Sequence, residues 1–134
     1  MKVGLLADIH GNLDALRATV NNLIADECTR LLIAGDLVGY YYETKEVLDM
    51  LSAFDCTFVR GNHEEMLAKF VRNETNIESI KSKYGSALEY CVRTLSDSQI
   101  EFLINSPVSM QVEIGNAVVN ISHGSPKSVE EYIY

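Results

Sequence analysis

Short apolar runs that end in turns rich in metal-binding residue types constrain the fold of this chain more than any other feature. The runs at residues 3–7, 31–34 and 57–59 are typical of buried strands. Between them, residues 13–27 and 43–51 repeat apolar side chains at helical spacing. Because strands and helices alternate, we predict parallel pairing with right-handed crossovers, which brings the three strand ends to one edge. Open α/β sheets bind ligands at such edges.

The second half of the chain carries signals for short helices and one hairpin. Ser96 and Gln99 have the spacing of a capping box and open a helix that we expect to end at residue 105. A Gly-Asn pair separates two strand-like runs at residues 108–114 and 117–121, which predicts a β-hairpin. We also expect helices at residues 64–71 and 84–94, and a loop or loosely held helix at residues 73–83.

Length and charge exclude several classes of protein. A chain of 134 residues fits one domain, residues 1–134, and its net charge of -8 argues against nonspecific binding to nucleic-acid phosphates. No apolar run approaches the length of a signal segment or a membrane span, so we expect a cytoplasmic protein without a membrane partner. The three cysteines are widely spaced, which predicts reduced, mostly packed thiols rather than zinc ligands.

Asp8 and His10 follow the first strand-like run and are separated by one residue. In an extended strand end both side chains would project to the same side, where they could bind one cation. Two ordinary alternatives stay open at this point. Asp8 could cap the helix that begins near Leu13, and His10 could be a loop residue with a satisfied ring.

The later turns carry the same residue types. Asp36 follows Gly35 immediately after a buried apolar run, where a carboxylate is costly without a partner, although a turn or helix-cap role would also explain it. Asn62 could be a turn residue, His63 a helix-start residue and His123 a structural one. Their joint occurrence at the ends of apolar strands is hard to explain by packing alone, so we predict a shared metal site.

The ordered set of turns resembles the calcineurin-like metallophosphoesterase superfamily, in particular its small bacterial and archaeal single-domain phosphoesterases. The resemblance implies an α/β fold in which two mixed β-sheets form a sandwich flanked by helices. It spans nearly the whole chain and rests on four blocks: Asp8-x-His10, Gly35-Asp36, Gly61-Asn62-His63-Glu64 and His123-Gly124.

The resemblance also implies a ligand set for two divalent ions. Asp8, His10 and Asp36 would bind one ion, while Asp36, Asn62 and His123 would bind the second, so that Asp36 bridges. Two such ions about 3.5 to 4 Å apart can hold a hydroxide for in-line attack on phosphorus. Carboxylate, amide and imidazole donors without thiolates favour Mn, with Fe, Zn, Ni or Mg as alternatives.

Two neighbouring residues receive catalytic roles from the same resemblance, in addition to the bridging Asp36. His63 would protonate the leaving oxygen or donate a hydrogen bond to the phosphate without binding metal. Arg60 would contact the phosphate through its guanidinium fork. Pairing of Arg60 with a nearby carboxylate is the alternative.

The chain departs from the family pattern in two places. The family finishes its site with a later Gly-His-x-His block, but no histidine follows His123 here. We therefore expect the N-terminal part of a longer domain, with a natural short variant or a covering partner chain as alternatives, and a second sheet with an incomplete edge that could support homo-oligomers. The run Tyr40-Tyr41-Tyr42 stands where relatives often carry glycine and proline. These tyrosines could form a wall of the substrate pocket or pack on the surface.

The leading hypothesis is a metal-dependent phosphoesterase that hydrolyses phosphomonoesters or phosphodiesters. The alternative, by analogy with the retromer subunit of the superfamily, is a catalytically impaired protein-interaction module. Retention of all the ligand-type residues favours the enzyme.

Overall fold

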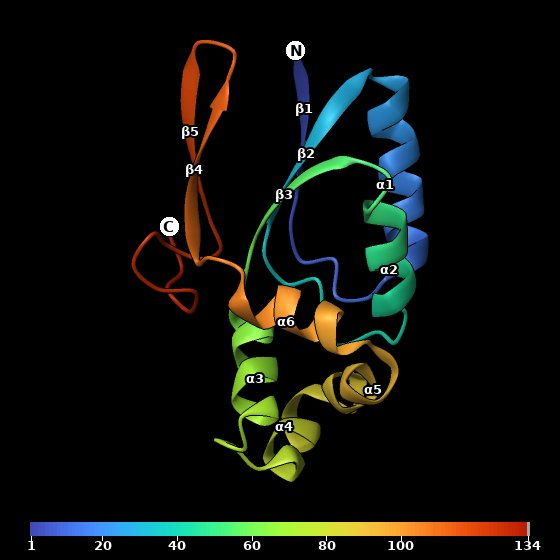
Figure 1. Ribbon diagram of the computed structural model, residues 1–134, viewed down its shortest axis with the longest axis vertical. Helices are drawn as coiled ribbons and strands as arrows, with labels where there is room; N and C mark the ends of the chain where they lie inside the picture. Colours follow the sequence, from blue (N-terminus) through green and yellow to red (C-terminus); the bar gives the residue numbers. More distant parts are fainter. Residues whose placement is uncertain (134) are drawn as a thin grey trace.

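The computed structural model describes residues 1–133, whose strands and helices form two sheets and a helical cluster (Figure 1). The first half of the chain alternates strands and helices, as predicted. In chain order the elements are β1 (Lys2–Leu6), α1 (Leu13–Ala25), β2 (Cys28–Ala34), α2 (Thr44–Leu51), β3 (Asp55–Val59), α3 (Asn62–Val71), α4 (Ile77–Tyr84), α5 (Ala87–Thr94), α6 (Asp97–Asn105), β4 (Ser109–Ile114) and β5 (Ala117–Ser122).

The first sheet is parallel with the order β1-β2-β3, so its three strand ends lie at one edge. Helices α1 and α2 cover one face of this sheet (Figure 1). Successive residues of β2 point to opposite faces, and Leu31 and Ile33 pack with Leu16 of α1 and Val47 of α2 in the larger core. The apolar stripes of both helices therefore bury the helix side of the sheet.

The second sheet is the predicted hairpin, in which β4 and β5 pair antiparallel. It lies on the other side of the first sheet from α1 and α2 (Figure 1). A smaller core joins the two sheets, because Leu32 and Val59 pack against Val112 and Ile121. The expected α/β arrangement of two sheets with flanking helices is confirmed, with one sheet parallel and the other antiparallel.

Helices α3 to α6 form a cluster below the ends of the parallel strands (Figure 1). The capping box that opens α6 is present, since Ser96 Oγ accepts the Gln99 N–H and Gln99 Oε1 accepts the Ser96 N–H. Residues 77–84 form a regular helix anchored by the buried Ile80, within the stretch expected to be a loop or a loosely held helix. The helix expected at residues 84–94 is interrupted at Gly85, whose φ of 78° ends α4.

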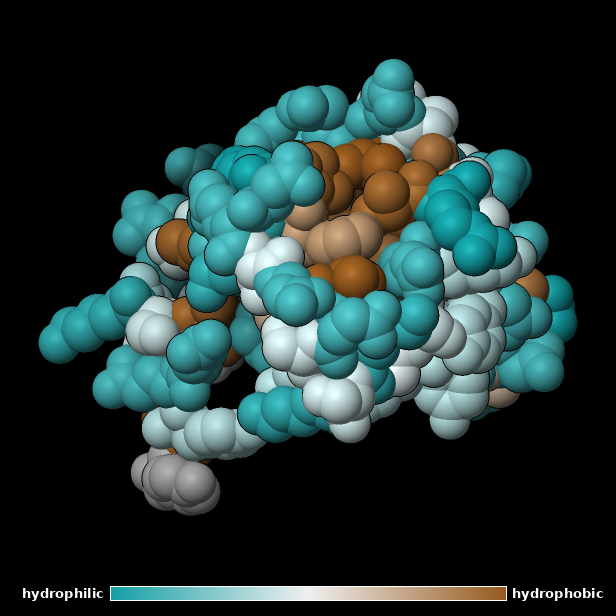
Figure 2. Space-filling view, turned by 90° about the horizontal axis from the view of Figure 1, so that it is seen from below, coloured by the Kyte–Doolittle hydropathy of each residue, from teal (hydrophilic) through white to brown (hydrophobic). Residues whose placement is uncertain are grey.

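Two further features concern the surface. An apolar hollow of about 580 Å³ opens between α2 and α6, with Leu48, Phe54 and Phe102 among its lining residues, and Figure 2 shows hydrophobic side chains gathered in a hollow on the face seen from below. Within residues 1–133, every helix is too short or too polar to cross a membrane.

Candidate metal centre

Asp8 and His10 lie in the loop that follows β1, beside the turn that follows β2. The loops are joined by backbone hydrogen bonds, from the Asp8 N–H to the Gly35 carbonyl at 3.2 Å and from the His10 N–H to the Asp36 carbonyl at 2.9 Å. The prediction of an extended strand end was wrong, because β1 ends at Leu6 and both residues have positive φ, 54° and 52°. The side chains still meet, with Asp8 Oδ1 at 3.7 Å from His10 Nε2.

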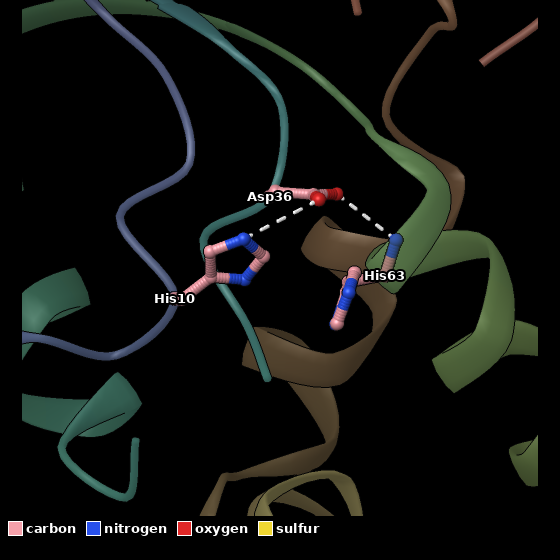
Figure 3. A group of neighbouring side chains, drawn as sticks. All are labelled: His10, Asp36 and His63. Atoms are coloured by element: carbon pink, nitrogen blue, oxygen red, sulfur yellow. Dashed lines mark hydrogen bonds and ion pairs between the residues drawn. The ribbon is translucent and has the colours of Figure 1, made fainter. Parts of the chain in front are cut away.

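Asp36 is the centre of the cluster (Figure 3). Only 2% of its surface is exposed, and its Oδ1 accepts the backbone N–H of His63 at 2.9 Å. Its Oδ2 lies 3.7 Å from Nε2 of His10 and 3.6 Å from Nε2 of His123. One carboxylate therefore both caps the start of α3 and faces two imidazoles that come from different loops.

Backbone carbonyls fix the orientation of these imidazoles. Nδ1 of His10 lies 2.9 Å from the Val38 carbonyl, and Nδ1 of His123 lies 2.8 Å from the Ala34 carbonyl. Because a carbonyl only accepts hydrogen bonds, Nδ1 carries the proton in each ring, and Nε2 of the neutral ring keeps a lone pair. Metal-binding histidines are commonly oriented in this way.

The lone pairs of three side chains converge beside His123. Asn62 Oδ1 lies 2.8 Å from His123 Nε2, and Asp36 Oδ2 lies 3.6 Å from the same nitrogen. With Asn62 Oδ1 directed at the ring, all three atoms are acceptors when the imidazole is neutral, so a cation or an added proton between them would be stabilising. The donor set of amide oxygen, carboxylate and imidazole is one that divalent transition ions accept.

Two groups of side chains could each hold an ion, and Asp36 belongs to both. Asp8, Asp36 and His123 form one group, while His10, Asp36 and His63 form the other, with the ligand atoms of each group within 4.8 Å of one another. The predicted ligands Asp8, His10, Asp36 and His123 are thus brought together. How they would divide between two ions stays a prediction. The residues present fit divalent ions.

Burial shifts the proton affinity of His63 and Asp36. The pKa of His63 is lowered to about 4, mainly by burial and further by His10 and His123. Its Nδ1 is buried and has no hydrogen-bond partner among residues 1–133. Burial raises the pKa of Asp36, against the opposing effects of the His63 N–H and of the His123 and His10 rings. Bound cations would oppose the effect of burial on the carboxylate.

Glu64 is a structural part of the site for which the sequence reasoning assigned no role. Its carboxylate is fully buried and accepts backbone N–H groups from Gly61 at 2.7 Å, Asp36 at 2.8 Å, Leu37 at 2.8 Å and Val38 at 3.1 Å. Burial and the neighbouring Asp36 raise its pKa to about 7, which the N–H donors oppose. A Glu at the third helical position after Gly61 has the spacing of half a capping box, and this spacing is the sequence signal that could have predicted the role of Glu64.

Gly61 allows the turn before α3 to approach Asp36. A Cβ atom at Gly61 would lie 2.1 Å from Asp36 Oδ1 and 2.8 Å from the Asp36 backbone nitrogen. Any larger residue would push the carboxylate away from the α3 N-terminus. The Gly-Asn-His sequence is therefore a packing requirement of the junction as well as a source of ligands.

Arg60 takes the alternative role that the sequence left open. Its guanidinium lies 3.1 Å from the Glu65 carboxylate and donates to the Ile104 carbonyl at 2.7 Å. Among the described residues, those lining the pocket around the metal ligands do not include Arg60. Its contacts tie the start of α3 to the end of α6.

The predicted ligands line an open pocket of about 710 Å³. Tyr40 and Tyr84 form part of its wall, with Lys83 beside them. Of the three consecutive tyrosines only Tyr40 lines the pocket, while Tyr42 bonds to Ser86 through its hydroxyl at 3.0 Å. The pocket therefore combines the ligand cluster with an aromatic wall.

Comparisons with known proteins identify the family and the fold of the chain. An uncharacterised protein of Methanocaldococcus jannaschii is 29% identical over 136 residues, covering 98% of this chain and 54% of that protein. Two crystal structures share the fold: a hypothetical protein of Pyrococcus horikoshii (22% identical, TM-score 0.73, covering 98% of this chain and 58% of that one) and a metallophosphoesterase of Sphaerobacter thermophilus (24%, 0.70, covering 98% and 50%). The chain thus spans about half the length of these relatives. The sequence model described as calcineurin-like phosphoesterase matches residues 1–126, and the chain belongs to that family.

Proposed function

We propose that this chain hydrolyses phosphomonoesters or phosphodiesters with the help of two divalent metal ions. The convergence of acceptor atoms around Asp36 is the observation that carries the proposal. His10 Nε2, His123 Nε2, Asn62 Oδ1 and the Asp36 carboxylate meet without a hydrogen-bond donor between them if both rings are neutral. Family membership makes phosphoester hydrolysis the corresponding chemistry.

The residues that would hold the ions are Asp8, His10, Asp36, Asn62 and His123. Bound ions would supply a nucleophile at neutral pH and stabilise charge on the phosphoryl oxygens. The mixed carboxylate, amide and imidazole donors suit Mn, Fe, Zn, Ni or Mg, and of these we propose manganese. The chain itself fixes the ligands before metal binding, because Val38 and Ala34 hold the two imidazoles and His63 holds the Asp36 carboxylate. Such preorganisation lowers the cost of assembling the site.

His63 would act on the substrate through a hydrogen bond. It lines the pocket, and its pKa of about 4 keeps the ring neutral near pH 7. A neutral imidazole retains one N–H, which suits donation to a phosphoryl oxygen better than delivery of a full proton to the leaving group. Of the two roles implied by the resemblance, we therefore propose hydrogen-bond donation.

The decisive experiment compares metal content and hydrolysis in Asp36→Asn. The amide keeps the shape of the side chain and can still accept the His63 N–H, so the fold should survive. Without the shared carboxylate, bound manganese should fall below two ions per chain, and hydrolysis of an aryl phosphate should fall by more than the roughly 10–100-fold typical of an outer-shell defect.

The matched control is Asp14→Asn, which alters an exposed carboxylate on α1 that pairs with Arg17 across one helical turn. This control should bind and hydrolyse as the parent chain does. Removal of the His63 ring by His63→Ala should preserve metal content and lower turnover. Unchanged metal content in Asp36→Asn, together with an inactive parent chain, would contradict the proposal.

A protein-interaction module remains the contrasting function, and nothing in the site favours it. Such a module has no need of imidazoles oriented by carbonyls or of a buried carboxylate between them. A parent chain that binds no metal would favour it.

A further inference from the structure

Tyr40 occupies a position in the metal pocket that packing alone does not explain. Its ring centroid lies 4.7 Å from that of His10, 4.9 Å from that of His63 and 6.4 Å from that of Tyr84. About half of Tyr40 is nevertheless exposed, and it lines the pocket. A large aromatic side chain thus remains partly exposed to solvent directly beside two residues of the proposed site.

The backbone at this position is unfavourable for a tyrosine. Tyr40 has a φ of 59°, in the left-handed region that bulky residues avoid. The preceding Gly39 packs against His63 so closely that a Cβ atom there would lie 2.1 Å from His63 Nδ1. The Tyr41 N–H then donates to the His10 carbonyl at 3.0 Å, which fixes the turn. Strain of this kind is concentrated at functional sites.

The faces of the Tyr40 ring are not used in parallel stacking with these neighbours. Its contacts with His10 and Tyr84 are edge-on, at 75° and 63° between ring planes, and its contact with His63 is tilted at 46°. Tyr84 also makes an edge-on contact with His63 and lines the same pocket. Aromatic rings prefer offset stacking or edge contacts, so a further flat ring can be accepted against such a wall.

A positive charge accompanies the aromatic wall. The ammonium of Lys83 lies 5.0 Å from the centroid of the Tyr84 ring, and Lys83 lines the pocket. Two acidic residues, Glu130 and Glu131, line the pocket as well. The aromatic side of the pocket thus offers flat apolar surface beside an ammonium group, with two carboxylates in the same lining.

We propose that Tyr40, supported by Tyr84, is a specificity subsite that stacks a flat aromatic ring carried by the phosphoester. The inference rests on the proposed function and deepens it, because it names the substrate class: phosphoesters whose esterified group carries a nucleobase or an aryl ring. Stacking of one base on an aromatic side chain changes affinity by roughly 5- to 150-fold.

The kinetic test compares adenosine monophosphate with ribose phosphate, which is the same sugar phosphate without the base. Hydrolysis adds water to each ester and releases inorganic phosphate, so one phosphate assay serves both. The ratio of their kcat/KM values in the manganese-loaded chain should favour the nucleotide by about tenfold, within the range of single-base stacking. In Tyr40→Ala this ratio should fall towards one, whereas Tyr40→Phe should keep it.

Tyr41→Ala is the matched control. Tyr41 is the next residue and is 52% exposed, compared with 50% for Tyr40, but it is not among the described residues that line the pocket. The control should leave the ratio unchanged. An equal loss for both esters in Tyr40→Ala would assign Tyr40 a purely structural role and overturn the proposal. A second comparison, of kcat/KM for phenyl phosphate and methyl phosphate, shows whether a simple aryl ring gains the same advantage as a nucleobase. An advantage for phenyl phosphate would indicate an aryl ester, and its absence would indicate a nucleotide.

A binding measurement separates the subsite from the proposed hydrolysis. Saturation-transfer NMR on the metal-free chain with adenosine monophosphate should show transfer to the adenine protons, which Tyr40→Ala removes and Tyr41→Ala retains. If this pattern is found and neither ester is cleaved, the hydrolytic proposal fails and the subsite stands. If both esters are cleaved equally and adenine receives no transfer, hydrolysis stands and the subsite is wrong.

Discussion

The two oxygens of Asp36 perform different tasks, and this division explains why a buried carboxylate is stable there. Oδ1 accepts the His63 N–H, which satisfies one of the free donors at the start of α3. Oδ2 faces the two imidazoles. Sequence reasoning offered a helix-cap role and a ligand role for Asp36 as alternatives, but the geometry allows both at once. A cation at Oδ2 would offset the remaining cost of burial.

The proton affinity of His63 provides a prediction at the same scale. In the metal-free chain its pKa is lowered to about 4, chiefly because the ring is buried. The ring of the unfolded chain has a pKa of about 6.5. Between these values only the unfolded chain binds the proton, so the contribution of His63 to stability is present above pH 6.5 and is lost as pH falls towards 4.

NMR titration of the histidine C2 protons checks this directly. The chain has three histidines, so the His63 signal is the one absent from His63→Gln. It should titrate well below the ordinary value, and the free energy of unfolding in urea should decline more on acidification from pH 6.5 in the parent chain than in His63→Gln. A His63 signal that titrates near 6.5 would contradict the burial argument.

At the scale of elements, Glu64 joins the start of α3 to the turn after β2. Its Oε2 accepts the N–H groups of Gly61 and Asp36, and its Oε1 accepts those of Leu37 and Val38. These turns carry the predicted ligands Asp36 and Asn62. Their relative position therefore depends on one buried carboxylate that contributes no ligand itself.

Glu64→Ala should be strongly destabilising for this reason. It leaves four backbone donors without their acceptor, and a buried unsatisfied group costs about 1–3 kcal/mol. We expect the free energy of unfolding, measured in urea, to fall by roughly 4 kcal/mol or more. The control Glu65→Gln alters the neighbouring partly exposed carboxylate that pairs with Arg60 and should cost less than about 1 kcal/mol. Equal losses in the two variants would show that the four donors find other acceptors.

Helices and strands whose ends are specified by nearby residues were predicted from the sequence. Backbone conformations that depend on contacts between distant residues were not. The capping box of α6 and the β4–β5 hairpin are specified by residues within each element, and both are confirmed. The positive φ values of Asp8 and His10 depend on backbone hydrogen bonds to the turn after β2, which lies more than twenty residues away in the sequence. The regularity of α4 likewise depends on burial of Ile80 in the main core. The residues that meet around Asp36 were predicted from the sequence, but the backbone conformation that brings them together was not.

At the scale of the whole molecule, the site joins parts that are otherwise held by separate cores. Asp8 and His10 follow β1, Asp36 follows β2, and His123 follows β5 of the second sheet. The larger core holds the parallel sheet to its helices, whereas the smaller core holds the hairpin to the opposite face. A metal ion between Asp36 and His123 would therefore link the two sheets directly.

This arrangement predicts that metal binding stabilises the entire fold. The ligands converge only when both sheets and α3 are in place, so an ion binds the folded chain far better than the unfolded one. At a free concentration 100 times its dissociation constant, an ion adds about 2.7 kcal/mol to the free energy of unfolding. For a domain of this size that corresponds to a rise in Tm on the order of 10 °C.

Differential scanning calorimetry with manganese should show this rise in Tm, and excess EDTA should reverse it. The variant Asp36→Asn should lose most of the rise, whereas the control Asp14→Asn should keep it. An unchanged Tm in saturating manganese would mean that the acceptors around Asp36 share a proton instead of a metal ion.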